Sequence, residues 1–203
     1  EEFAIHECIH YIQEIKDKKN NLIRMGLCNF DALKIVGMGL NEAAVQQMAS
    51  IASDAKLDTV KYYNMELSTE SPDFYPLQTA LINEMTYFTG TYPLYHSTLY
   101  SNDVFKNTFI AKSNTKAYIQ IEKNFDLILE YESRLSEETY KLSVSSEELK
   151  NLDKIKRINA KIDALKKIIF ETTLETQNLI IVNCFNNELN SIKTLEDVKN
   201  FQY

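Results

Sequence analysis

Hydrophobic residues recur at helical spacing in three stretches of the first half of the chain. In the first stretch they are Phe3, Ile5, Ile9, Ile12 and Ile15. Steps of three and four residues predict a helix over residues 3–18, and similar patterns predict helices over residues 40–55 and 76–88. Residues 22–39, which hold three of the four glycines, and the tyrosine-rich residues 89–100 are expected to be irregular.

The second half of the chain carries a longer and more regular pattern. Its apolar positions are Tyr118, Ile121, Phe125, Ile128 and Leu135, followed by Ile155, Ile158, Ile162, Leu165 and Ile169. The two runs flank a polar break at residues 143–146, which predicts a long antiparallel helical hairpin with a coiled-coil-like seam. Thr194 is expected to cap a last short helix. Residues 1–112 are therefore expected to form a core region and residues 113–203 a helical hairpin subdomain.

The composition favours long helices and narrows the function. The chain of 203 residues has only 4 Gly and 3 Pro, too few for many short strands joined by turns. Its 22 Lys and Arg residues are outnumbered by 29 Asp and Glu residues, for a net charge of -7. This charge argues against a broad surface for nucleic acid or anionic lipid. No apolar run reaches the roughly 20 residues of a membrane-spanning helix.

The three cysteines are expected to be free and mostly buried. Cys8, Cys28 and Cys184 are too irregularly spaced for a disulfide framework and form no CxxC pair for a zinc finger. Free thiols favour a reducing, cytoplasmic environment. The chain begins with Glu1, only five residues before its first motif, so a truncated N-terminus is expected.

An HExxH motif begins at His6. Residues four apart share one face of a helix, so His6 and His10 can bind one ion, and zinc accepts imidazole nitrogen. Glu7 lies one step round the helix, where a carboxylate can take a proton from water and pass it to a leaving amine. An apolar side of the same helix, which includes Ile9 and Ile12, is expected to bury it.

A further carboxylate completes a set of three metal ligands. Glu42 lies near the start of the second predicted helix. Its oxygen, together with two imidazole nitrogens, gives the three protein ligands of a catalytic zinc and leaves one position for water. Zinc lowers the pKa of such a water from 15.7 to about 7 and polarises a carbonyl.

HExxH followed by a helix that opens Asn-Glu-Ala resembles the gluzincin branch of bacterial zinc metallopeptidases, the thermolysin-like group. The resemblance covers residues 3–52. It implies that His6, His10 and Glu42 bind zinc and that Glu7 is the general base.

The chain departs from this family pattern in three respects. Thirty-one residues separate His10 from Glu42, more than in thermolysin-like members. Gln46 stands where these enzymes often carry an Asp that orients a zinc histidine, although an amide can also accept a ring N–H bond. The β-sheet that usually precedes the motif helix is expected to be missing or minimal.

Some roles remain open at this stage. A histidine or tyrosine from a later loop often stabilises the oxyanion in this class of enzyme, so Tyr92, Tyr95 and His96 are candidates. Asn41 is expected either to hydrogen-bond across the cleft, as in the family, or to cap its helix. Cys8 lies on another face of the motif helix and is expected to be a small apolar filler.

Other metal chemistries fit less well. A metzincin requires Gly and His where this chain has Gln13 and Lys16. Glu7 and His10 also form the ExxH step of a di-iron carboxylate bundle, but no second ExxH exists among only three histidines. The alternative that stays open is a catalytically inactive zincin-like helical protein, acting as a metal-dependent binding or regulatory module.

The sequence therefore predicts a mainly α protein, in which a zincin-like motif helix and a glutamate helix are followed by a long antiparallel hairpin. The expected activity is hydrolysis of peptide bonds with Zn2+ as cofactor and Glu7 as base. The expected partners are a peptide or protein substrate, and the C-terminal hairpin offers a surface for a further protein.

Overall fold

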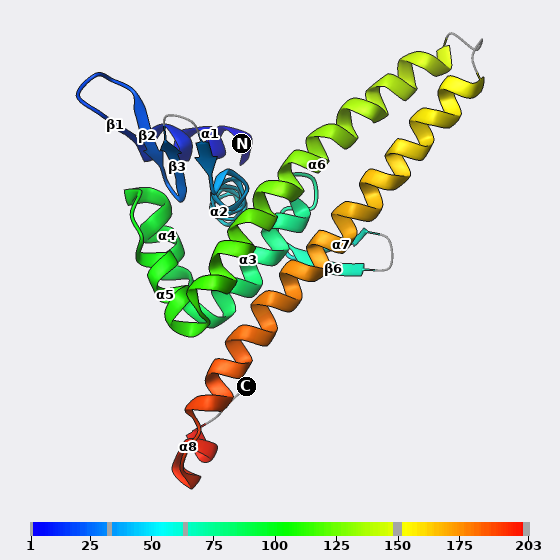
Figure 1. The fold of residues 1–203 in the computed structure, drawn as a ribbon. Helices are drawn as coiled ribbons and strands as arrows, with labels where there is room; N and C mark the ends of the chain where they lie inside the picture. The colour runs from blue at the N-terminus through cyan, green and yellow to red at the C-terminus, as the bar shows by residue number, and fades with distance from the viewer. Residues whose placement is uncertain (1, 32–33, 63–64, 148–151, 201–203) are drawn as a thin grey trace.

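The computed structural model describes residues 2–31, 34–62, 65–147 and 152–200, which form a mainly helical fold with two small antiparallel sheets (Figure 1). The helices are α1 (Glu2–Gln13), α2 (Met38–Ala52), α3 (Pro76–Thr89), α4 (Thr91–Tyr100), α5 (Val104–Lys112), α6 (Thr115–Glu147), α7 (Leu152–Ser191) and α8 (Leu195–Asn200). The strands are β1 (Glu14–Lys16), β2 (Leu22–Met25), β3 (Cys28–Asp31), β4 (Lys34–Val36), β5 (Asp58–Tyr62) and β6 (Met65–Thr69). The predicted mainly α fold is confirmed.

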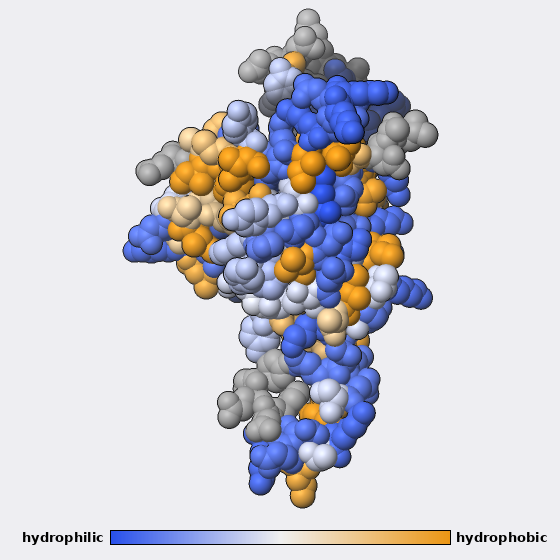
Figure 2. Space-filling model, turned by 90° about the vertical axis from the view of Figure 1, so that its left-hand side faces the viewer, coloured by the Kyte–Doolittle hydropathy of each residue, from blue (hydrophilic) through white to orange (hydrophobic). Residues whose placement is uncertain are grey.

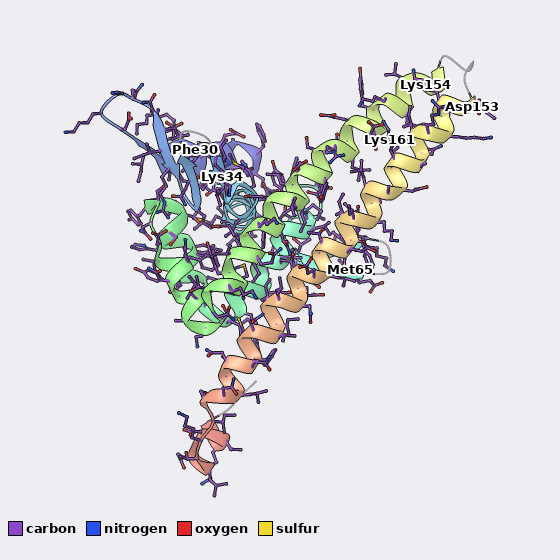
Figure 3. The ribbon with its side chains drawn as sticks, viewed as in Figure 1. Phe30, Lys34, Met65, Asp153, Lys154 and Lys161 are labelled. Atoms are coloured by element: carbon purple, nitrogen blue, oxygen red, sulfur yellow. The ribbon has the colours of Figure 1, made fainter. Side chains whose placement is uncertain are left out.

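The long pair α6 and α7 runs diagonally through the molecule and confirms the predicted helical hairpin (Figure 1). Its seam residues Ile121, Phe125 and Ile128 are fully buried in the main core. The same core contains residues of α2, α3 and α5 and also Met65 of β6, which is labelled in Figure 3. The core therefore holds residues from both sides of the predicted boundary at residue 112. No helix in the described part of the chain is long and apolar enough to cross a membrane.

The segment between α1 and α2 is a sheet rather than the irregular stretch that was predicted. Strands β1 to β4 pair with their sequence neighbours in an antiparallel meander. Gly26, with φ +57°, helps to close the tight β2–β3 connection, a backbone conformation that favours glycine. The motif helix consequently ends at Gln13, earlier than predicted, and the meander returns the chain so that α2 packs against α1.

Several other expectations need correction. Residues 91–100 form helix α4 and not a loop, while α5 and the β5–β6 hairpin were not predicted. Cys28 and Cys184 are buried, but Cys8 is exposed and fills no core space. The cap of the last helix is confirmed, because the amide of Asp197 donates to Thr194 Oγ1 at 3.2 Å.

Only part of the predicted apolar side of α1 packs against the rest of the protein. Ile9 is buried, but Ile12 is 59% exposed and Tyr11 is 81% exposed. The buried face of this helix instead carries His6, His10 and Gln13, of which His10 is half-buried. Figure 2, viewed from the side of the N-terminal sheet, shows patches of apolar surface between hydrophilic areas.

The start of α2 is fixed by the long helix α6. Gly37 and Gly39 donate their backbone N–H groups to the carboxylate of Asp126, at 2.9 and 2.8 Å. A carboxylate at a helix N-terminus satisfies free N–H groups and complements the helix dipole. Since Gly37 has no side chain to cap with, Asp126 takes over this role from another element.

Replacing Gly39 by alanine should destabilise the protein, although alanine is the better helix former by about 1 kcal/mol. A Cβ atom at this position would lie 2.2 Å from the backbone oxygen of Phe125. We expect urea unfolding to show a net loss of about 1–3 kcal/mol in the free energy of unfolding. An unchanged or higher stability would contradict the close approach of α2 to α6.

Candidate metal centre

One face of α1 packs on one face of α2, and the residues of both faces follow the same sequence spacing. Each face uses positions i, i+3, i+4 and i+7, which share one side of a helix. The residues are His6, Ile9, His10 and Gln13 of α1, and Glu42, Val45, Gln46 and Ala49 of α2. Ile9, Val45 and Ala49 form a small apolar cluster of their own. This cluster holds the polar positions of the two helices opposite one another.

The three predicted metal ligands come together in this interface. His6 Nε2 and His10 Nε2 are 3.0 Å apart. Glu42 Oε2 lies 3.4 Å from His6 Nε2, and Glu42 Oε1 lies 3.3 Å from His10 Nε2. His6 is buried, and the His10 and Glu42 side chains are only 16% and 13% exposed. Among the described residues, this is the group of three side chains placed to hold a metal ion.

The spacing of the three donor atoms fits a zinc ion. Ligand atoms about 2.0–2.1 Å from a tetrahedral zinc lie roughly 3.3 Å from one another. The two Nε2 atoms are 3.0 Å apart, and each lies 3.3–3.4 Å from a different oxygen of the Glu42 carboxylate. One donor atom from each of the three residues lies within 4.8 Å of the other two. Two nitrogens and one carboxylate oxygen are also a donor set that zinc prefers, and they leave a fourth position free.

The orientation of the His6 ring is fixed by Gln46. Gln46 Oε1 lies 2.8 Å from His6 Nδ1. The amide nitrogen of Gln46 donates to Glu2 Oε1 at 2.5 Å and to Ser71 Oγ at 2.9 Å. Because a carboxylate only accepts, these contacts turn the amide oxygen towards the ring, so that Nδ1 carries the hydrogen. The predicted ability of Gln46 to accept a ring N–H bond is therefore confirmed at His6.

His10 is oriented in the same way by a second amide. Asn41 Oδ1 accepts the backbone N–H of Leu27 at 3.0 Å, so the Asn41 amide nitrogen faces Gln13 Oε1 at 3.3 Å. The same Gln13 oxygen lies 3.2 Å from His10 Nδ1 and accepts its hydrogen. Asn41 is fully buried and neither caps α2 nor faces the cleft.

The contacts of Gln46 with His6 and of Gln13 with His10 determine the charge that the cluster requires. With hydrogen on each Nδ1, both Nε2 atoms present lone pairs to each other and to a carboxylate, an arrangement that requires a cation. Burial by itself lowers the pKa of His10, but the hydrogen bond and charge of Glu42 outweigh it and raise that pKa. Burial also opposes ionisation of Glu42, yet its contacts with His10 and His6 lower its pKa to about 2. The raised pKa of His10 favours a proton there, which is one source of such a cation.

The cluster opens into a cleft of about 1120 Å³ between α1, α2, α6 and residues 73–76. His6, His10 and Glu42 all line this cleft, so their free side can be reached by a ligand. Glu7 also lines it, with an exposed side chain next to the cluster but outside the set of ligands. This is the place that the sequence predicted for a general base.

Tyr75 is a residue of the cleft that the sequence did not single out. Its ring stacks at 6.1 Å on that of His6. Burial, together with the charge and hydrogen bonding of Glu42, raises its pKa to about 12, so the phenol keeps its proton and can donate it. Tyr75 adopts the left-handed conformation, with φ +50°, just before Pro76 begins α3. A non-glycine residue in this conformation is uncommon and often belongs to a functional site.

The three residues proposed from sequence for the oxyanion lie elsewhere. His96 contacts the rings of Tyr92 and Tyr100 and the amide of Asn102 within and after α4. Tyr95 packs against the main core. None of Tyr92, Tyr95 and His96 lines the cleft at the metal centre.

A scan against protein-family models gives no match for this chain, and searches of curated proteins and of solved structures also give none. The assignment of a function therefore depends on the chemistry of the cleft.

Proposed function

We propose that this protein is a zinc-dependent metallopeptidase, in which His6, His10 and Glu42 hold the ion and Glu7 is the general base. The observation that carries the proposal is the convergence of His6, His10 and Glu42, with one donor atom from each within 4.8 Å of the others, on one side of an open cleft. The resemblance of the motif to gluzincins supports the same assignment. A merely structural zinc site is usually closed by four protein ligands, whereas this set leaves one position free.

A zinc ion at this centre supplies Lewis acidity, which lowers the pKa of water and polarises a carbonyl. Glu7 accepts the proton of the attacking water and donates it to the amine of the leaving peptide. Gln46 and Gln13 keep the two imidazoles in the orientation that turns both Nε2 atoms to the centre. The cleft binds the peptide and holds its scissile bond beside these groups.

Tyr75 has the position and protonation state of an oxyanion donor. Negative charge develops on the carbonyl oxygen when water adds to a peptide bond. A phenol whose pKa is raised to about 12 stays protonated over the working pH range and can donate to that oxygen. The left-handed backbone at Tyr75 holds the ring against His6, so little reorganisation is needed.

Metal analysis combined with peptide hydrolysis tests the proposal. Protein purified without chelator should contain one zinc per chain and cleave members of a mixed peptide library. Chelation should abolish cleavage, and added zinc should restore it. Protein that takes up no zinc would overturn the proposal. Full zinc occupancy without cleavage would favour the metal-dependent binding module instead.

The Tyr75→Phe variant should retain zinc and lose peptidase activity by about 10²–10³ in kcat, because one oxyanion donor is removed. The phenylalanine keeps the ring contact with His6 and the burial of the site. Tyr92→Phe, at an exposed tyrosine outside the cleft, is the control and should leave kcat unchanged. Equal kcat values for Tyr75→Phe and the wild-type protein would contradict this role.

Zinc affinity should decrease as the pH falls through the raised pKa of His10. Below that pKa a proton must leave His10 before the ion binds, so Kd rises about tenfold per pH unit for each proton displaced. Glu42, with a pKa of about 2, stays ionised throughout this range. Competition with a chromophoric chelator between about pH 8 and about pH 6 measures the slope. A pH-independent Kd would place the zinc away from His10.

A further inference from the structure

The wall of the cleft opposite the metal centre is acidic. It is formed by one face of α6, which presents Leu129, Glu132, Ser133, Ser136 and Glu137. Asp73 lies on the adjoining loop, and Glu7 lies on the α1 side. Among the residues that the structure describes, those that line the cleft include no Lys and no Arg. A peptide in this cleft therefore meets carboxylates that no lining lysine or arginine neutralises. Glu42 differs from the others because it lies beside the two histidines.

Glu132 is the inner member of this wall. It is half-buried, and the amide of Gln78 donates a hydrogen bond to it. Within the described ranges, no lysine, arginine or histidine forms an ion pair with Glu132. Burial accordingly raises its pKa. A carboxylate that has lost much of its water without gaining a cation is stabilised by any positive group that enters the cleft.

Glu137 lies further along the same face of α6 and is exposed. The nearest cation, Lys141 Nζ, is 4.0 Å from Glu137 Oε2 and lies closer to Glu138, at 2.9 Å. Lys161 of α7 also approaches Glu138, which therefore faces the partner helix. Figure 3 shows Lys161 and Lys154 on the part of the hairpin that extends towards its tip. Lys141 of α6 and Lys161 of α7 both lie closest to Glu138, so the 4.0 Å contact with Lys141 is the ion pair of Glu137 among the described residues.

We propose that Glu132 and Glu137 select peptides that carry a lysine or arginine side chain next to the scissile bond. The inference rests on the proposed peptidase function and names its substrate class. The apolar residues of the cleft, such as Met38, Phe74 and Leu129, accept the aliphatic stem of such a side chain, and the carboxylates accept its charged end. The net charge of -7 additionally attracts cationic peptides at low ionic strength.

A lysine scan of one fluorogenic peptide tests the selection with the zinc-loaded protein. Lysine is placed in turn at each position from three residues before to three residues after the cleaved bond, with glutamine and glutamate versions for comparison. At the best position kcat/KM should be about tenfold higher for lysine than for glutamine, as expected from two partly exposed charge contacts. The glutamate peptide should be the poorest substrate, and the preference should decrease with added salt.

The double variant Glu132→Gln/Glu137→Gln should lose most of the preference for lysine, measured as the ratio of kcat/KM for the lysine and glutamine peptides. Glu130→Gln is the matched control, because Glu130 is an exposed glutamate of α6 that does not line the cleft. This control should keep the full preference. A preference that survives the double variant would overturn the assignment to these two glutamates.

Binding of the labelled lysine and glutamate peptides to the Glu7→Gln variant, measured by fluorescence anisotropy, separates the two proposals. Cleavage of all peptides at equal kcat/KM would overturn the substrate class and leave the peptidase function intact. Salt-sensitive binding of the lysine peptide without cleavage by the wild-type protein would overturn the peptidase function and retain the selection of cationic peptides. The absence of both cleavage and selective binding would overturn both.

Discussion

Peptide hydrolysis should fall by about 10²–10⁴ when Glu7 is replaced by glutamine, the range expected for loss of a general base. The amide has nearly the same shape as the carboxylate but cannot accept the proton of the attacking water at neutral pH. Zinc should remain bound at one ion per chain, because Glu7 is not one of the three donors that converge at the centre. The expected result is therefore an inactive protein with a full metal site.

Kinetics and metal analysis on the same preparation check this expectation. Glu14→Gln is a suitable control, since Glu14 follows α1 directly and does not line the cleft. It should behave like the wild-type protein in both measurements. Unchanged hydrolysis by a zinc-loaded Glu7→Gln variant would assign the proton transfer to another group. Loss of zinc from that variant would show that Glu7 supports the metal site itself.

The cluster of His6, His10 and Glu42 was predictable from sequence because its main determinants are local. The four-residue spacing of His6 and His10 has a fixed meaning on any helix, and Glu42 was recognised through its helical context. The contact between Gln46 and His6 follows from the same regularity, since position 46 lies one turn beyond position 42. The long seam of α6 and α7 was equally clear, because a helical pattern repeated over many turns leaves little ambiguity.

Strands β1 to β4 were missed because they are short. Strands β1 to β4 contain three or four residues each, too few for an alternating pattern to stand out from noise. Helix α4 was missed for a different reason. Pro93 was interpreted as a helix breaker, but it lies in the first turn of α4, where its missing N–H group costs no hydrogen bond.

The residues that support the site from behind do so through tertiary contacts, which a sequence pattern does not contain. Asp126 caps α2 although it belongs to α6. It lies 89 and 87 positions after the two residues that it contacts, Gly37 and Gly39. Tyr75 reaches His6 only through its left-handed backbone and the packing of α3 on α2. The residue before a proline is steered away from the right-handed helical region. The sequence predicted a helix from residue 76 but did not show that Tyr75 adopts the left-handed conformation.

Replacing Glu42 by glutamine should remove zinc from the protein. The variant keeps the size of the side chain and loses the negative charge of the carboxylate, whose two oxygens lie 3.4 Å from His6 Nε2 and 3.3 Å from His10 Nε2. Zinc affinity should fall by more than the 10–100-fold that is usual for changes behind the ligands. Glu84→Gln is the control, because Glu84 is also half-buried but hydrogen-bonds Gln177 and does not line the cleft.

The Glu42→Gln variant should also change the pKa of His10 in the absence of metal. The carboxylate of Glu42 opposes the effect of burial on His10, so its removal should lower the pKa of His10 in the chelated protein. NMR titration of the imidazole protons measures the change against the wild-type and Glu84→Gln proteins. With a lower pKa, the variant holds fewer protons on His10 near neutral pH, and the two bare Nε2 atoms repel each other. An unchanged His10 pKa would mean that the carboxylate at position 42 lies far from the ring, and the peptidase proposal would then lose its geometric basis.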